Sequence, residues 1–135
     1  MGRLRKQDNG ARALFKRNLP QFHWTAIETG ALSSGVPDCE YCTPTGITGW
    51  IEFKAWYREE GKACPKIRPA QIGWIEKRVR MGGKAFIGVL CEGKVYLVRG
   101  ELARDLPKVL AEQVKNGEYF KNWREIGDFL GSEDG

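Results

Sequence analysis

The sequence has no long hydrophobic run, so a membrane-spanning helix is not expected. Its first residues, Met-Gly-Arg-Leu-Arg-Lys, have no apolar stretch, and we therefore expect no secretory signal and a cytoplasmic protein. Internal repeats and low-complexity tracts are also missing. Histidine occurs once, at His23, with no partner motif nearby, which favours a structural over a catalytic role for that side chain.

The sequence contains four cysteines: Cys39, Cys42, Cys64 and Cys91. A cytosolic chain is expected to keep them reduced. Cys39 and Cys42 have the spacing of half a zinc knuckle, but the other two lack the matching second pair. Two interpretations stay open: the cysteines bind zinc, or, as we favour, they are small semi-apolar residues that fill strands.

The composition is that of an ordinary globular protein, and 135 residues predict a single domain over 1–135. A net charge of +5 favours an anionic partner. Much of this charge lies in the first 17 residues, which we interpret equally as a solvated basic segment or as a contact to the phosphate backbone of DNA. The basic residues concerned are Arg3, Arg5, Lys6, Arg12, Lys16 and Arg17. We expect an arm over about 1–9 and a flexible acidic tail over about 131–135.

Hydrophobic periodicity predicts alternating strands and helices, and therefore an α/β fold. Strands are predicted over 22–28, 38–42, 47–55, 84–91 and 94–98, with Glu92-Gly93 as a hairpin turn. Helices are predicted over 10–19 with Asp8 or Asn9 as the cap, 69–81, 101–115 with Pro107 as an interruption or boundary, and 119–130. The expected inward-facing residues of the last two are Leu102, Leu106, Val109, Leu110, Val114, Phe120, Trp123, Ile126 and Phe129.

Three polar residues stand out among apolar neighbours: Asp38, Glu52 and Lys54. Glu52 and Lys54 are two apart, so a strand would place both side chains on one face of the sheet. Turn-forming residues between Asp38 and Glu52 predict a hairpin that brings the two carboxylates together. A divalent cation with oxygen ligands would relieve their repulsion, polarise a phosphoryl oxygen and acidify a bound water.

This pattern resembles the PD-(D/E)XK nuclease superfamily. The matching residues are Pro37-Asp38, then Glu52-Phe53-Lys54, then Arg68-Pro-Ala-Gln71 at the start of a helix, over roughly residues 10–98. With Gly35, they look most like the branch that contains VRR-NUC domains, Holliday-junction resolvases and small phage endonucleases. The resemblance implies a restriction-endonuclease-like core, with a central mixed β-sheet flanked by helices.

The resemblance also implies site roles. Asp38 and Glu52 would hold Mg²⁺, with Mn²⁺ as a substitute, Lys54 would position the attacking water, and Gln71 would support the site. Resolvases of this kind carry an acid in the first helix, where this chain offers only Asp8. The further ligand is therefore Glu28, Asp8 or none. Glu28 alternatively ends its strand as a simple charge, which we slightly favour.

The expected function is a Mg²⁺-dependent DNA endonuclease with no small-molecule cofactor, which binds DNA through the basic residues above and Arg68. One small domain leaves little room for a separate sequence-reading module, which favours structure-selective or weakly specific cutting and a homodimer if both strands are cut. Two alternatives remain: a catalytically silent DNA-binding domain on the same fold, and a zinc-stabilised nucleic-acid adaptor.

Overall fold

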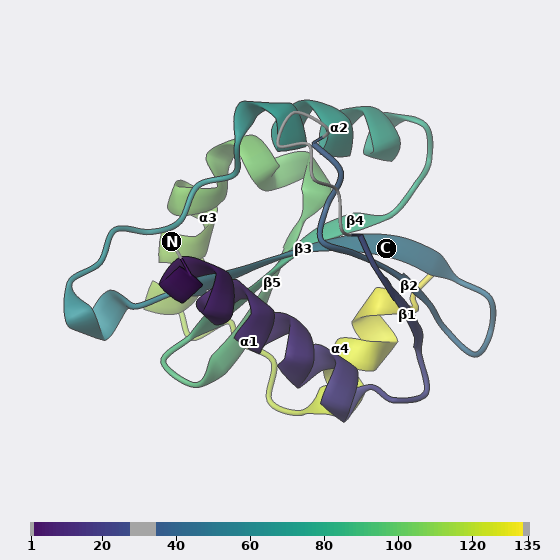
Figure 1. The fold of residues 1–135 in the computed structure, drawn as a ribbon, viewed down its shortest axis with the longest axis horizontal. Coiled ribbons are helices and arrows are strands. Elements are labelled where there is room, and N and C mark those ends of the chain that lie inside the picture. Colours follow the sequence, from purple (N-terminus) through teal and green to yellow (C-terminus); the bar gives the residue numbers. More distant parts are fainter. Residues whose placement is uncertain (1, 28–34, 134–135) are drawn as a thin grey trace.

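The computed structural model describes residues 2–27 and 35–133, with side chains from residue 10 onward. It has an α/β fold in which a five-stranded mixed sheet is flanked by helices (Figure 1). The strands are β1 (His23–Ala26), β2 (Cys39–Cys42), β3 (Thr48–Trp56), β4 (Ala85–Cys91) and β5 (Lys94–Arg99), which lie in the sheet in this order. The β3–β4 pair is parallel, and the other neighbouring pairs are antiparallel.

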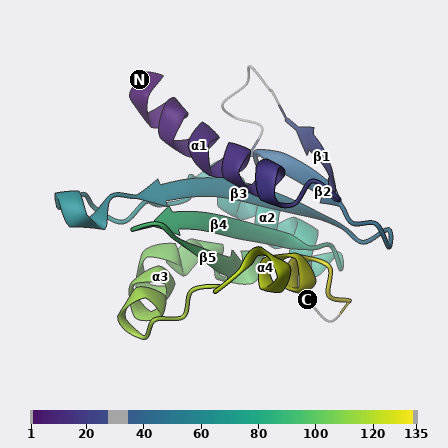
Figure 2. The same cartoon turned by 90° about the horizontal axis from the view of Figure 1, so that it is seen from below.

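Four α-helices cover the two faces of this sheet. They are α1 (Gly2–Asn18), α2 (Pro69–Arg80), α3 (Leu106–Lys115) and α4 (Trp123–Leu130). Helices α1 and α4 lie on one face, in front of the strands in Figure 2, and α2 and α3 lie on the other. In the described parts of the chain, no helix is both long and apolar enough to cross a bilayer.

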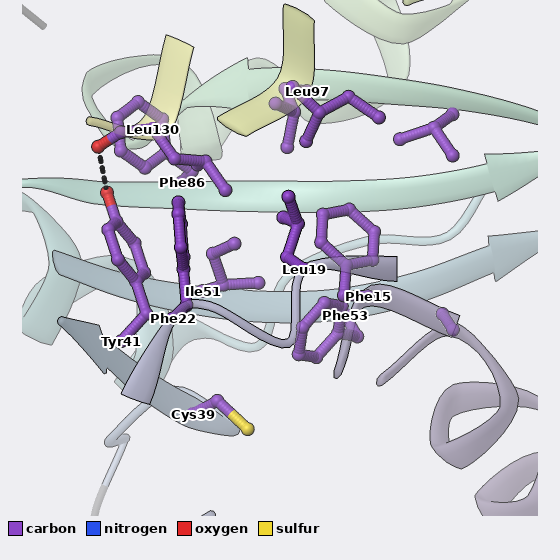
Figure 3. Packing of buried hydrophobic residues seen from close by; sticks show 13 residues of the cluster. Phe15, Leu19, Phe22, Cys39, Tyr41, Ile51, Phe53, Phe86, Leu97 and Leu130 are labelled. Carbon is purple, nitrogen blue, oxygen red and sulfur yellow. Dashed lines mark hydrogen bonds between the residues drawn. The ribbon is translucent and has the colours of Figure 1, made fainter. Parts of the chain in front are cut away.

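The core on the α1 side is built from one set of alternating strand positions. Phe15 of α1 and Leu19, which follows the helix, pack there with Ile51 and Phe53 of β3, and all four are at most 1% exposed (Figure 3). Because neighbouring side chains on a strand point to opposite faces, Glu52 and Lys54 must point to the α2 side. The alternation of β3 therefore decides on which face of the sheet the candidate site lies.

The core on the α2 side takes the other set of strand positions. Val89 of β4 and Tyr96 of β5 pack there with Ile75 of α2 and with Leu106 and Leu110 of α3. Burying apolar surface on both faces explains why β4 is an almost continuous apolar run, as expected for a strand in the middle of a sheet.

The predicted strands are confirmed to within two residues at each end that the structure describes. The hairpin turn at Glu92 and Gly93 is confirmed too, since both residues have positive φ, 52° and 75°, as a tight hairpin between twisted strands requires. The helix predicted over 69–81 corresponds to α2, which has Pro69 in its first turn.

Three predictions about helices are wrong. Helix α1 begins at Gly2, so Asp8 and Asn9 lie inside the helix rather than at its cap, and 1–9 is not a separate arm. The helix predicted over 101–115 begins only at Leu106, after a 3₁₀ turn over Gly100–Asp105; the boundary predicted at Pro107 is confirmed, because proline fits the first turn of a helix and not its interior. The last helix begins at Trp123, after Asn122 accepts a capping hydrogen bond from the Glu125 N–H at 2.9 Å.

One side-chain prediction and the tail also need correction. Leu102 is 40% exposed, because it lies on the 3₁₀ turn rather than on an amphipathic helix. Phe120 packs against the core as predicted, but it precedes α4 and forms an isolated bridge with Val95 of β5. The tail predicted from residue 131 begins with a hydrogen-bonded helix end, since the Gly131 N–H donates to the Gly127 carbonyl at 3.0 Å.

Helix α4 is attached to the sheet by one buried hydrogen bond. The Tyr41 hydroxyl donates to the Leu130 carbonyl at 2.7 Å, and both residues are fully buried (Figure 3). The carbonyl belongs to the last turn of α4, which has no intrahelical partner to offer it. Gly49 lies opposite Tyr41 on β3, and a side chain there would collide with the tyrosine ring.

We expect Tyr41→Phe to lower the free energy of unfolding by about 1–3 kcal/mol, because it leaves a buried carbonyl without a partner. Urea denaturation monitored by tryptophan fluorescence measures this. Tyr57→Phe, at a half-buried tyrosine in the loop after β3, is the matched control and should lie within about 0.5 kcal/mol of wild type. Equal stability of the Tyr41 variant and wild type would contradict this role for the bond.

Candidate active site

The predicted hairpin brings Asp38 and Glu52 together, and two hydrogen bonds hold them there. The Asp38 N–H donates to Glu52 Oε1 at 3.2 Å, and the Phe53 N–H donates to Asp38 Oδ2 at 3.0 Å. The β2–β3 ladder ends one step away, where Cys39 lies opposite Ile51. The two carboxylates therefore extend the ladder beyond the end of β2, and the backbone fixes one oxygen of each.

A glycine allows the segment before Asp38 to lie against α2. Gly35 has φ of +72°, and a Cβ at this position would collide with the Ala70 carbonyl oxygen. Only glycine satisfies both requirements without strain. This close approach brings the first turn of α2, and Gln71 within it, to the Asp38–Glu52 pair.

Gln71 is the polar residue of α2 that faces the site, and it is 4% exposed. Its side chain hydrogen-bonds to Glu52. Because Gln71 Oε1 is buried without a hydrogen-bond partner, the amide donates to Glu52 through Nε2. A buried oxygen without a partner is costly in a structural role and is suited to a water or a cation in the site.

Three cationic side chains act on Asp38, and one of them, Lys54, also acts on Glu52. Lys54 Nζ lies 3.6 Å from Glu52 Oε2, on the same face of β3 as predicted. The positive charges of Lys54, Arg12 and Arg68 all act on Asp38. They lie on three different parts of the chain: Lys54 on β3, Arg12 on α1, and Arg68 directly before α2. Arg68 is carried there by the connection over residues 57–68, which projects beyond the sheet before it turns back to α2 (Figure 1).

Burial makes both carboxyl groups weaker acids. Desolvation, followed by repulsion from Asp38, raises the pKa of Glu52 to about 7, against the opposing effects of Lys54 and of hydrogen bonds from Gln71 and the Asp38 N–H. Desolvation also raises the pKa of Asp38, although the Phe53 N–H and the three cations lower it. The pair therefore tends to hold a proton near neutral pH, which a bound cation would displace.

The donor set fits a hard divalent cation. Asp38 and Glu52 offer carboxylate oxygens and Gln71 offers its free amide oxygen, and these are the ligands that Mg²⁺ and Mn²⁺ prefer. Mg²⁺ is commonly held by one or two carboxylates together with water and substrate phosphate, so two carboxylates are enough. The predicted further ligand Glu28 lies outside the described residues, and so do the side chains of Arg3, Arg5, Lys6 and Asp8.

The structure excludes a zinc site made by all four cysteines. Cys39 lies in the core on the α1 side, whereas Cys64 and Cys91 belong to the core on the opposite face. The sheet separates them, and four thiolates cannot surround one tetrahedral ion across it. In the described part of the chain, no three His, Cys, Asp or Glu side chains are grouped so as to hold a metal. All four cysteines are free thiols.

Two features near the site escaped the sequence reasoning. Arg12 was expected only as a DNA contact, but it hydrogen-bonds to the Cys39 side chain beside Asp38. The second feature is a cluster between α2 and β3, in which the Arg78 guanidinium lies over the rings of Trp50, at 5.4 Å, and Trp74, at 4.5 Å. Trp74 and Arg78 are one turn apart on α2, but the contacts of Arg12 with Cys39 and of Arg78 with Trp50 join segments that are distant in the chain, so no sequence pattern signals them.

The other predicted DNA contacts differ in position. Lys16 and Arg17 are exposed on α1, and the charge of Lys16 reaches Cys39, next to Asp38.

No protein-family model matches the chain, and no curated protein matches it in sequence. The resemblance to PD-(D/E)XK nucleases therefore stays a prediction from the motif residues in the sequence.

The raised pKa of Glu52 gives a test of the site without any substrate. Folded protein holds the Glu52 proton up to pH about 7, whereas the unfolded chain releases it near 4.5, so the free energy of unfolding should fall as pH rises between these values. Glu52→Gln should remove most of this fall. At pH 8 the variant should be more stable than wild type by about 1–3 kcal/mol.

Urea denaturation from pH 4.5 to 8.5 in the presence of a chelator measures the effect. Glu112→Gln, at an exposed acid on α3, is the control and should follow the wild-type curve. If the wild type and Glu52→Gln curves ran parallel over this range, the assignment of a buried, protonated Glu52 would be wrong.

Proposed function

We propose that the protein is a metal-dependent endonuclease that hydrolyses phosphodiester bonds in DNA. One observation carries the proposal: the buried carboxyl group of Glu52 and the half-buried one of Asp38 lie side by side, with Lys54 Nζ 3.6 Å from Glu52. A perturbed acid pair with an adjacent amine is an arrangement suited to a metal-assisted hydrolase. The motif that these residues form in the sequence supports the same class.

Each side chain has a defined part in this proposal. Asp38 and Glu52 would hold Mg²⁺ or Mn²⁺, and Gln71 would orient Glu52 through its amide. The cation, when bound, supplies Lewis acidity toward the phosphate and lowers the pKa of water. Lys54 orients the attacking water and offsets the negative charge that develops at phosphorus. The water oxygen bonds to phosphorus, its proton passes to solvent, and the P–O bond to the leaving sugar oxygen breaks as that oxygen takes up a proton.

DNA is the proposed partner because the surroundings of the site are basic. The chain carries a net charge of +5, and Arg12, Lys54 and Arg68 all act on Asp38. Phosphate contacts of this kind bind DNA without reading its sequence. We therefore favour structure-selective or weakly specific cutting, as in Holliday-junction resolvases. Cutting both strands of a duplex would take two copies of the chain, since one Asp38–Glu52 pair serves one phosphate at a time.

A cytoplasmic location forms part of this proposal and agrees with the free thiols of all four cysteines. The alternative of a catalytically silent DNA-binding domain would use the same basic surface. It gives no reason for a buried Glu52 beside a half-buried Asp38, because negative charge weakens the binding of phosphate to a surface.

The first experiment is cleavage of labelled four-way junction, flap and linear duplex DNA with Mg²⁺, Mn²⁺ or chelator. We expect metal-dependent cleavage by wild type, and a fall in kcat of about 10²–10³-fold in Lys54→Ala, because a preorganised positive group is lost. Asp38→Asn should lose cleavage and also the stabilisation by Mn²⁺ seen in thermal unfolding.

Lys77→Ala is the matched control, because Lys77 is exposed on α2 and the substitution removes the same positive charge as Lys54→Ala. It should retain the kcat of wild type. Wild-type protein that binds these DNAs but cleaves none of them, with either cation, would favour the silent DNA-binding domain.

A further inference from the structure

A hollow of about 500 Å³ lies at the end of the sheet where the parallel strands β3 and β4 finish. Trp56, the last residue of β3, and Glu92, which follows β4, both line it. The last turns of α3 form another wall, and this helix lies at the same end of the sheet as the tips of β3 and β4 (Figure 2). Ligand sites usually measure about 300–1,000 Å³, and the carboxyl ends of parallel strands commonly carry them.

Two half-buried aromatic rings line the hollow, and a contact to a neighbour fixes each of them. The indole N–H of Trp56 donates to the Lys62 carbonyl at 3.0 Å. The ring of Tyr119 lies edge-on to that of the buried Tyr96, with 6.3 Å between the ring centroids. A ring that is fixed and partly exposed offers a surface on which a nucleic-acid base of any kind can stack.

The hollow has a positive charge balance. The charged residues among the described ones that line it are three cations and one acid: Arg58, Lys94, Lys115 and Glu92. The acid is ion-paired with the arginine, since Arg58 Nη1 lies 3.1 Å from Glu92 Oε2. Lys94 Nζ lies over the ring of Tyr119, 5.1 Å from its centroid. The hollow thus combines cations for a phosphate with rings for a base, as sites for single-stranded nucleic acid do.

This hollow is next to the candidate active site along β3. Lys54 and Trp56 are two positions apart, so their side chains point to the same face of the sheet, where Trp56 packs with the core on the α2 side. At a rise of about 3.3 Å per residue, they are only about 7 Å apart along the strand. A DNA strand with a phosphate at Lys54 can therefore place a neighbouring nucleotide in the hollow.

We propose that this hollow binds an unpaired nucleotide of the DNA strand that is cut, with its phosphate against Lys94 and Lys115 and its base against Trp56 and Tyr119. The proposal rests on the function proposed above and adds the class of substrate: DNA with unpaired nucleotides next to the cut, as in a flap. Bases in an intact duplex are paired and stacked inside the helix, so they cannot reach a ring on the protein. The hollow therefore selects flap DNA over a fully paired duplex.

Loss of a ring and loss of a lysine should weaken the binding of single-stranded DNA in different ways. Tyr119→Leu removes the ring and keeps apolar volume, and the affinity for a short oligothymidylate should fall by about 5- to 150-fold, as for one lost stacking contact. Lys115→Gln should lower the slope of log affinity against log salt concentration by about 0.7, as for one lost phosphate contact on a single strand. Both variants should bind blunt duplex DNA as wild type does.

Fluorescence anisotropy with labelled oligothymidylate and labelled blunt duplex, in the presence of a chelator, measures these affinities without cleavage. The matched controls are Phe129→Leu, at a half-buried ring of α4 on the opposite face, and Lys108→Gln, at an exposed lysine of α3. Both should bind the oligothymidylate as wild type does. With Mg²⁺, Tyr119→Leu should cut flap DNA with kcat/KM lowered by the same factor as its affinity, and should cut duplex DNA as wild type does.

Wild-type affinity for oligothymidylate in both Tyr119→Leu and Lys115→Gln would overturn the proposal, whatever the cleavage assay shows. An equal loss of affinity for oligothymidylate and duplex would overturn it too, because the hollow would then not distinguish unpaired DNA. Lys115 is exposed, so its substitution leaves the fold intact and tests the proposal even if Tyr119→Leu does not fold. Oligothymidylate binding that both variants weaken, in a protein that cleaves no DNA, would instead reject the nuclease function, so the two failures are distinguishable.

Discussion

The repulsion between two carboxylates that the fold keeps side by side is the constraint on which the candidate site depends. Asp38 and Glu52 are held by backbone N–H groups of the same hairpin, so neither can move away without breaking the end of the β2–β3 ladder. Burial and mutual repulsion raise the pKa of Glu52 to about 7. The surrounding structure has to supply cations and hydrogen-bond donors that offset the repulsion between the two carboxylates.

Both layers of helices contribute such groups. Helix α2 brings the Gln71 amide from one face of the sheet, and α1 brings the Arg12 guanidinium from the other. They meet because β1 and β2 are short, so that β3 continues past Asp38 with no strand beside it on that edge in the described structure. The site thus lies at an end of the sheet that both faces can reach, and the two apolar cores stabilise the elements that carry it.

Local patterns made much of the fold and the centre of the site predictable. Period-two alternation predicted the faces of Glu52 and Lys54, turn residues predicted the hairpin that joins Asp38 to Glu52, and Pro69 marked the start of α2. The predictions failed where packing decides the outcome. Leu102 has the spacing of a buried helical residue, but Pro107 moves the start of α3 beyond it.

Contacts between distant segments were not predictable at all. Gly35 could be recognised as a flexible residue from the sequence. Its close approach to the Ala70 carbonyl, which leaves no room for a Cβ, depends on how the segment before β2 packs against α2. In the sequence, Arg12 is one of six basic residues among the first 17. Its hydrogen bond to Cys39, which depends on how α1 packs against the sheet, distinguishes it from its neighbours. Charge patterning indicates a class of partner, whereas the role of a single cation depends on tertiary structure.

The two hydrogen bonds at Asp38 and Glu52 could by themselves be a latch that closes the hairpin, and magnitudes decide between a latch and a reactive site. Hydrogen bonds to charged groups contribute about 1.5–3 kcal/mol each. Burying ionised carboxylates costs several kcal/mol each, and their repulsion adds to this. Asparagine or glutamine oxygens would accept the same N–H groups without that cost. A latch alone would therefore not require two acids, an adjacent lysine and a buried amide oxygen without a partner. Together these groups are better explained as an arrangement that a cation completes.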